Sequence, residues 1–193
     1  MQAMTGYRRM WLAAALAVSG LSAASAAPAD PSGTYLTEDG RARIRVEPCG
    51  RNSAQMCGYV VWMKSSRGPG GEPLLDSKNP DPAKAGRPVL GHQLMMGLRA
   101  KDTGYEGRIY NNEDGKSYNV TIWLEGSDLL KVRGCLVAFL CSTQDWKRTR
   151  DVAAGQLAGA TGGASGPAPD PEYAALSAPG ASAAAGRKDT KRP

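Results

Sequence analysis

Histidine is almost absent from this sequence, since His92 is the only one among 193 residues. Any mechanism that needs two imidazoles is therefore excluded, and with it the zinc hydrolases built on a His-Glu-x-x-His motif. Nor does any stretch after residue 27 approach the ~20 consecutive apolar residues with which a helix crosses a bilayer. We therefore expect no transmembrane segment in the mature protein, and no membrane channel.

The sequence also lacks the usual patterns of catalytic sites. It has no Gly-x-Ser-x-Gly elbow, so a serine triad through His92 is not indicated, and we interpret His92 as a surface or loop residue. Paired carboxylates hydrolyse glycosides only at particular separations, which a sequence does not reveal. We predict a protein that is not an enzyme, with no catalytic residue and no cofactor. A carboxylate-dependent envelope hydrolase is kept as an alternative.

The first 26 residues have the features of a secretory signal peptide. Arg8 and Arg9 precede an apolar stretch over 11–21, and small residues follow at 24–26. The segment holds two arginines and no acids, so its removal lowers the formal net charge from +6 to +4. That modest charge, without a basic stripe among aromatics, disfavours nucleic acid as a partner. We predict a periplasmic or secreted protein.

Residues 151–193 differ in composition from the rest of the chain. Of these 43 residues, 28 are Ala, Gly, Pro or Ser, and large apolar residues are few. Such a segment buries too little apolar surface to offset the entropy lost on ordering. We predict a disordered tail over 151–193, following a single domain over 27–150.

That domain shows the period-two alternation of half-buried strands. In residues 41–47, for example, Ala42, Ile44 and Val46 alternate with charged residues. The expected strands are 33–37, 41–47, 57–64, 105–111, 117–124, 128–134 and 139–148. Only residues 91–98 indicate a helix, and a short one. We predict an all-β antiparallel meander that is closed or nearly closed into a barrel, because closure removes exposed strand edges.

The four cysteines fit this picture. Cys49 and Cys57 flank the connection between two expected neighbouring strands, and Cys135 and Cys141 flank another. An even number of cysteines in an exported chain favours disulfides, and local pairing 49–57 and 135–141 is the simplest of three connectivities. The spacings are too wide for the knuckles of a four-thiolate metal site, so we predict no metal.

The connection over 65–86 is much longer than the ~2–5 residues usual in a hairpin. It contains Asp76, Asn79 and Asp81, whose oxygens suit either a calcium loop or the caps of tight turns. Arg87, which follows it, suits either the clamping of a carboxylate or phosphate ligand or an ion pair with Asp76 that pins the loop.

Aromatic residues recur along the expected strands. Their period-two placement favours the barrel core, and the alternative is an exposed surface for an envelope protein; they are Tyr59, Trp62, Tyr105, Tyr110 and Trp123. The candidate ligand-binding residues are Trp62, Asp76, Asn79, Arg87 and Tyr110.

Several sequence blocks resemble a bacterial family catalogued as domain of unknown function 2147. They span nearly all of 33–149 and include Cys57-Gly58-Tyr59-Val60-Val61-Trp62, Asp76-Ser77-Lys78-Asn79-Pro80-Asp81-Pro82, Leu130-Lys131-Val132-Arg133-Gly134-Cys135 and Cys141-Ser142-Thr143-Gln144-Asp145-Trp146-Lys147-Arg148. The resemblance implies a small, secreted, β-rich domain and no established activity. This chain departs from the family pattern at Tyr35, where Trp is commoner, and in its alanine-rich tail.

The ends of the domain are also similar to those of lipocalins. Gly33-x-Tyr35 and Trp146-x-Arg148 resemble the positions at which a first-strand aromatic packs under a late arginine. An eight-stranded barrel encloses room for side chains or for one small ligand. We therefore predict a lipocalin-like barrel that binds a small apolar or amphiphilic ligand, with an envelope protein-interaction module as the alternative.

Overall fold

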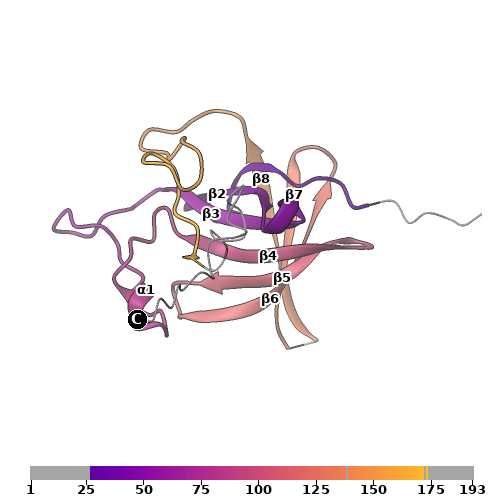
Figure 1. Ribbon diagram of the computed structural model, residues 1–193, viewed down its shortest axis with the longest axis horizontal. Coiled ribbons are helices and arrows are strands. Elements are labelled where there is room, and N and C mark those ends of the chain that lie inside the picture. The colour runs from indigo at the N-terminus through magenta and orange to yellow at the C-terminus, as the bar shows by residue number, and fades with distance from the viewer. Residues whose placement is uncertain (1–26, 138, 172, 174–193) are drawn as a thin grey trace, which may run out of the picture.

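The computed structural model describes residues 27–137, 139–171 and 173, and these form one closed antiparallel barrel of eight strands (Figure 1). The strands are β1 (Gly33–Leu36), β2 (Ala42–Cys49), β3 (Gln55–Met63), β4 (Gln93–Lys101), β5 (Gly104–Asn111), β6 (Lys116–Glu125), β7 (Leu129–Val137) and β8 (Leu140–Thr149). Each strand pairs with its neighbours in the chain, and β1 also pairs with β8, which closes the ring. The predicted all-β meander is thus confirmed.

The alternation in the sequence separates the inside of the barrel from its outside. On β2, Ile44 and Val46 are almost fully buried. Arg43 and Arg45, which alternate with them, bond to Asp151 and Thr161 outside the barrel. All strands except β5 contribute fully buried residues to one inner core, and Tyr105 and Ile109 of β5 pack against it. The inner core consists of Tyr35, Ile44, Val46, Met56, Val60, Leu94, Met95, Leu98, Val120, Ile122, Leu130, Val132 and Trp146.

The helix expected over 91–98 is wrong, because residues 93–98 belong to β4 and residues 91 and 92 form the turn before it. Leu94, Met95 and Leu98 are buried at spacings of three and four, which is typical of one helical face. The strand buries the same set because its register against β5 shifts between Met96 and Arg99, as at a β-bulge. Gly97 lies within this irregularity at a φ of 54°, a conformation that glycine adopts readily.

The two disulfides are those expected from the local spacing. Cys49–Cys57 joins β2 to β3, and Cys135–Cys141 joins β7 to β8. Each closes a short loop, so each constrains the unfolded chain by roughly 2 kcal/mol of loop entropy. The bridges therefore reinforce neighbouring strand pairs.

The end of the barrel where β1 begins is closed by Tyr35 and Arg148. The Tyr35 side chain is completely buried, and the Arg148 guanidinium lies 4.7 Å from its ring centroid. Arg148 also donates hydrogen bonds to the carbonyls of Ser127 and Ser32. At Gly33 a Cβ atom would lie 2.0 Å from Arg148 Nη1, so only glycine allows this approach.

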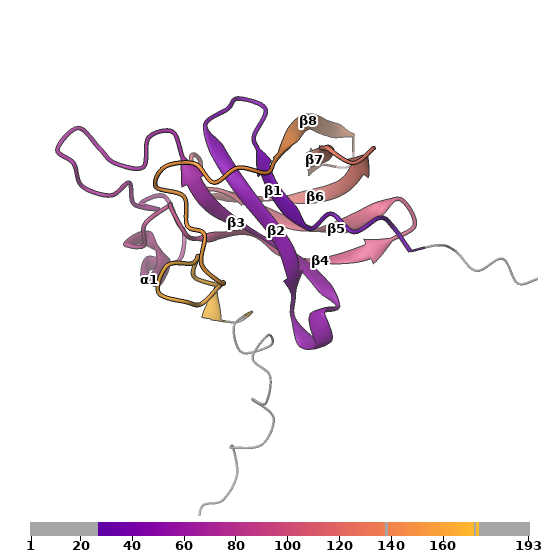
Figure 2. The same ribbon diagram turned by 90° about the horizontal axis from the view of Figure 1, so that it is seen from above.

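Residues 151–171, which we call the C-terminal strap, pack along the outside of β3 (Figure 2). The Leu157 amide donates to the Val61 carbonyl at 2.8 Å, and Trp62 Nε1 donates to the Ala154 carbonyl at 3.1 Å. A small outer core forms there from Cys49, Cys57, Tyr59 and Val61, with Leu157 and Tyr173 packed against it.

The strap differs from the disordered tail predicted to begin at residue 151. Polar and backbone hydrogen bonds fix this Ala- and Gly-rich segment on the barrel, although it has few large apolar residues. The expected signal peptide, residues 1–26, and the rest of the expected tail, residues 174–193, lie outside the described residues. Within the described part of the chain, no helix combines the length and the hydropathy needed to cross a membrane.

Candidate ligand-binding site

A cavity of about 740 Å³ lies at the end of the barrel opposite to Tyr35 and Arg148. In an antiparallel meander every second turn lies at the same end, and the turns β1–β2, β3–β4, β5–β6 and β7–β8 meet here. The first three turns and the β7–β8 strand ends contribute lining residues, including Arg41, Leu74, Asn112 and, at the end of β7, Leu136. Because three of these connections are short, the long β3–β4 connection is the main cover of this end.

The cavity has an apolar interior and a polar rim. Its interior side chains come from β2 to β8 and include Ile44, Val60, Leu94, Ile109, Val132 and Trp146. At the rim, Arg41 Nη1 and Glu113 Oε1 form an exposed ion pair at 3.1 Å, with Asp39 and Lys64 nearby on the lining. An apolar pocket with a few polar groups at one side suits a molecule with an apolar body and a polar group.

Asp76 organises the long connection from a completely buried position. Its carboxylate accepts hydrogen bonds from Tyr110 Oη at 2.6 Å, Asn79 Nδ2 at 2.8 Å and Arg87 Nε at 3.1 Å. Its amide donates to the Arg87 carbonyl at 2.9 Å. Tyr110 lies on β5, so these bonds tie the connection to the barrel wall.

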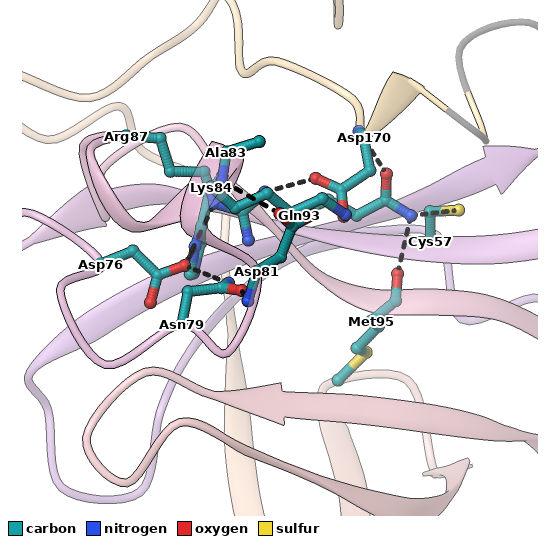
Figure 3. Close-up of polar contacts among 11 residues, drawn as sticks. Cys57, Asp76, Asn79, Asp81, Ala83, Lys84, Arg87, Gln93, Met95 and Asp170 are labelled. Carbon is teal, nitrogen blue, oxygen red and sulfur yellow. Dashed lines mark hydrogen bonds and ion pairs between the residues drawn. The ribbon is translucent and has the colours of Figure 1, made fainter.

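Arg87 links Asp76 to the C-terminal strap (Figure 3). Its Nη1 forms an ion pair with Asp170 Oδ1, and Lys84 Nζ holds Asp170 Oδ2 at 2.8 Å. The Asp170 amide donates to Gln93 Oε1 at 3.0 Å, which joins the strap to β4. Two buried carboxylates thus face two cations, so the charges of this network balance.

His92 lies in the connection before β4, in keeping with the loop position expected for it, but it is buried beside the same network and not at the surface. Its Nδ1 lies 3.6 Å from Asp76 Oδ2 and has no hydrogen-bond partner in the described part of the chain. Burial, together with the nearby Arg87 charge, lowers the pKa of His92 to about 4. The imidazole is therefore neutral at neutral pH.

Burial also raises the pKa of Tyr110, and the hydrogen bond to the Asp76 carboxylate raises it further. Tyr110 and His92 both line the barrel cavity. On the strap side, Lys84, Arg87, His92 and Asp170 line a second cavity of about 640 Å³. The network therefore stands between the two cavities.

The structure brings together four of the five candidate ligand-binding residues. Asp76, Asn79, Arg87 and Tyr110 share the network described above, and Tyr110 alone of these also lines the barrel cavity. Trp62 lies apart from them on the outside of the barrel, under the strap and with the Arg43 guanidinium 5.6 Å from its ring centroid.

Four members of the network were not singled out as site residues from the sequence, namely Lys84, His92, Gln93 and Asp170. Gln93 reaches the network from β4, His92 from the turn before β4, and Asp170 from the strap. Asp170 lies in a segment whose composition indicated disorder, and no local pattern marks Gln93. The sole histidine was visible in the sequence, but its burial depends on the β3–β4 connection.

The Asp and Asn residues of the connection act as turn and helix caps. Asn79 Oδ1 accepts from the Asp81 amide at 2.9 Å, and Asp81 Oδ1 accepts from the Ala83 amide at 2.9 Å at the start of α1 (Pro82–Ala85). Among the residues described, no group of three or more His, Cys, Asp or Glu side chains gathers as metal ligands do. Asn79 and Asp81 thus make the contacts of the capping alternative.

The geometry defines a lipocalin-like barrel that is closed at one end and hollow at the other. Residues 33–148 match the model of a family described as "Uncharacterized protein conserved in bacteria (DUF2147)", and the chain belongs to that family. The family resemblance seen in the sequence is thereby confirmed.

A solved structure, protein HP1028 from the human pathogen Helicobacter pylori, described as belonging to the lipocalin family, is similar with a TM-score of 0.53. The two are 21% identical over 63% of this chain and 84% of that chain, a likeness that shows the fold alone. No curated protein matches the sequence.

Proposed function

We propose that this protein binds a small apolar or amphiphilic molecule in the cavity of its barrel, without catalysis. The observation that carries the proposal is the distribution of side chains in that cavity. Apolar residues from the strands surround its depth, and charged or amide side chains stand at its rim. A ligand would place its apolar body against residues such as Ile109 and Val132 and its polar group near the Arg41–Glu113 pair.

The polar contacts of Asp76 with Asn79, Arg87 and Tyr110, which we call the Asp76 network, hold the β3–β4 connection over this cavity. Asp76 has no exposed surface, and three side chains of its own chain donate to its oxygens. A carboxylate engaged in this way is poorly placed to attack a substrate or to move a proton. The contacts favour a positioning role for Asp76, Asn79 and Arg87, whereas Tyr110 and His92 line the cavity itself.

The same contacts weigh against the envelope hydrolase alternative. Asp76 is one of the acids that such a hydrolase could use, with Glu72, Asp81 and Glu106. An Asp76→Asn variant that abolished turnover of a glycoside while keeping the fold would restore the alternative. The interaction-module alternative stays a prediction. Two of its aromatic candidates, Tyr59 and Tyr110, are buried, and Trp62 bonds to the strap.

The two disulfides support an oxidising compartment as the place where the protein works. We therefore propose a periplasmic or secreted protein, in keeping with the signal peptide predicted for residues 1–26.

A titration with the fluorescent fatty acid cis-parinaric acid tests the proposal. Val132 is buried on β7 and lines the cavity, whereas Arg133, next to it, is exposed on the outer face. A Val132→Trp side chain would fill the cavity, and Arg133→Trp adds the same side chain outside it. We expect saturable binding with at least about a tenfold loss of affinity in V132W and none in R133W.

Unfolding curves of both variants establish that the barrel still forms. Equal affinities in the parent, V132W and R133W would show that the fatty acid binds elsewhere, and would contradict a ligand site inside the barrel.

A further inference from the structure

The exposed apolar side chains of this protein gather at the tip of the β7–β8 hairpin. Leu136, Val137, Phe139 and Leu140 are 59%, 46%, 90% and 58% exposed. They are four of the six large apolar residues that are exposed in the described part of the chain. Exposed apolar side chains that gather in one place often mark an interaction site.

The covalent structure and sequence of the hairpin favour a fixed apolar surface. Cys135 and Cys141 pair directly across β7 and β8 and form a disulfide just below the tip. No charged residue occurs between Arg133 and Asp145. The tip is therefore both restrained at its base and free of charge.

The tip also borders the mouth of the barrel cavity. Leu136 and Leu140 line that cavity, whereas Val137 and Phe139 do not. β7 ends and β8 begins at the lower edge of the ribbon in Figure 1, away from the strap. One side of the hairpin thus faces the cavity, and the other is open to an external partner.

We propose that this tip inserts into the surface of a lipid bilayer. The four side chains expose roughly 450 Å² together, taking about 150–200 Å² for a fully exposed side chain of this size. A stable protein partner or a second copy of the chain needs about 800 Å² per side. A bilayer requires no matching surface and takes up a small apolar protrusion at its headgroup boundary.

Such docking would bring the cavity mouth to the membrane, so that a ligand passes between bilayer and barrel with little exposure to water. The inference goes beyond the proposed function, because binding of a ligand from solution requires no membrane. The two are therefore tested separately.

Sedimentation of the mature protein, without the predicted signal peptide over 1–26, with phosphatidylcholine vesicles tests the docking. These vesicles carry no net charge, so basic residues such as Arg187 and Lys188 gain little from them. The test variant is the pair Val137→Asp and Phe139→Asp, which leaves the cavity lining intact. The matched control is Val152→Asp, since Val152 is 66% exposed but lies on the strap.

We expect the parent and V152D to sediment with the vesicles to the same extent, and the V137D/F139D protein to lose at least about nine-tenths of that binding. Because the tip is uncharged, 0.5 M salt should change the bound fraction by less than about twofold. A Phe139→Trp variant should lose fluorescence in vesicles of brominated phosphatidylcholine, which shows that the tip itself enters the lipid.

Absence of vesicle binding by the parent, or equal binding by V137D/F139D, would overturn the proposal. So would a dimer in vesicle-free solution that V137D/F139D dissociates, because a second copy would then cover the tip. Binding of cis-parinaric acid in solution should be the same in V137D/F139D and the parent, so failure of docking is distinguishable from failure of ligand binding.

Discussion

At one end of the barrel Tyr35 is fully buried beneath the Arg148 guanidinium, whereas the other end leaves a cavity of about 740 Å³ and an exposed apolar hairpin tip. The closed end combines short turns with the contact between the first and the last strand. The open end depends on the long β3–β4 connection, which the Asp76 network and the strap hold in place. Stability and ligand binding therefore belong to different ends of one sheet.

Truncation at the closed end should have the largest effect on folding. Tyr35→Ala removes a completely buried aromatic ring and the surface on which Arg148 stacks. We expect the free energy of unfolding, measured with urea, to fall by about 3–5 kcal/mol. The affinity for cis-parinaric acid in the fraction that remains folded should stay within about twofold of the parent. A variant of parental stability would show that Tyr35 does not support this end.

The open end should instead respond to pH, through His92. Its pKa in the folded protein is about 4, below the ordinary value of about 6.5, so the unfolded chain takes up the proton first as the pH falls. The free energy of unfolding should therefore fall by roughly 3 kcal/mol as the pH drops from about 6.5 to about 4. Below pH 4, His92 should cause no further loss.

His92→Gln provides the control for this pH dependence, because glutamine is of similar size and does not titrate. Urea unfolding across the window should give a nearly flat profile for H92Q. Acids with lowered pKa values, such as Asp151 and Asp114, titrate at lower pH in both proteins. An unchanged slope in H92Q would mean that other groups cause the acid sensitivity.

The smallest effect should come from the strap. Asp170→Asn weakens the ion pairs with Arg87 and Lys84, whose side chains are partly exposed, so we expect a loss of roughly 2 kcal/mol. Hydrogen exchange of the Leu157 and Ala168 amides should speed up, because both bond to the barrel. The amides of β6 and β7 should be unaffected.

Asp151→Asn is the matched control within the same strap. The Asp151 carboxylate is exposed, so we expect the loss of its pair with Arg43 to change stability much less than Asp170→Asn does. If D170N and D151N had equal effects on exchange, the buried network would not be what fastens the strap.

The closed end was largely predictable from the sequence. Alternation such as that in β2 depends only on which residues are apolar, and the Cys49–Cys57 disulfide at this end depends only on which strands are neighbours. The Gly33-x-Tyr35 and Trp146-x-Arg148 pairs correctly indicated how the first and last strands meet. β4 was missed because the irregularity at Gly97 gives a strand the spacing of a helix.

The open end was predictable only in part. The sequence placed Asp76, Asn79 and Arg87 in one long connection and included the pairing of Arg87 with Asp76 among its alternatives, and that pair is present. The ion pair between Arg87 and Asp170, which are more than 80 residues apart in the chain, was not predicted, because no local sequence pattern indicates it. The strap also lies outside residues 33–148, which match the family.

Methyl NMR spectra recorded with and without cis-parinaric acid test the central claim most directly. If the ligand occupies the open end of the barrel, the methyl signals of Ile44, Ile109 and Val132, which line the cavity, should shift and show contacts to the fatty acid. The methyl signals of Val61, in the outer core beneath the strap, should stay in place. Shifts confined to Val61 and Leu157 would place the ligand outside the barrel and contradict the account.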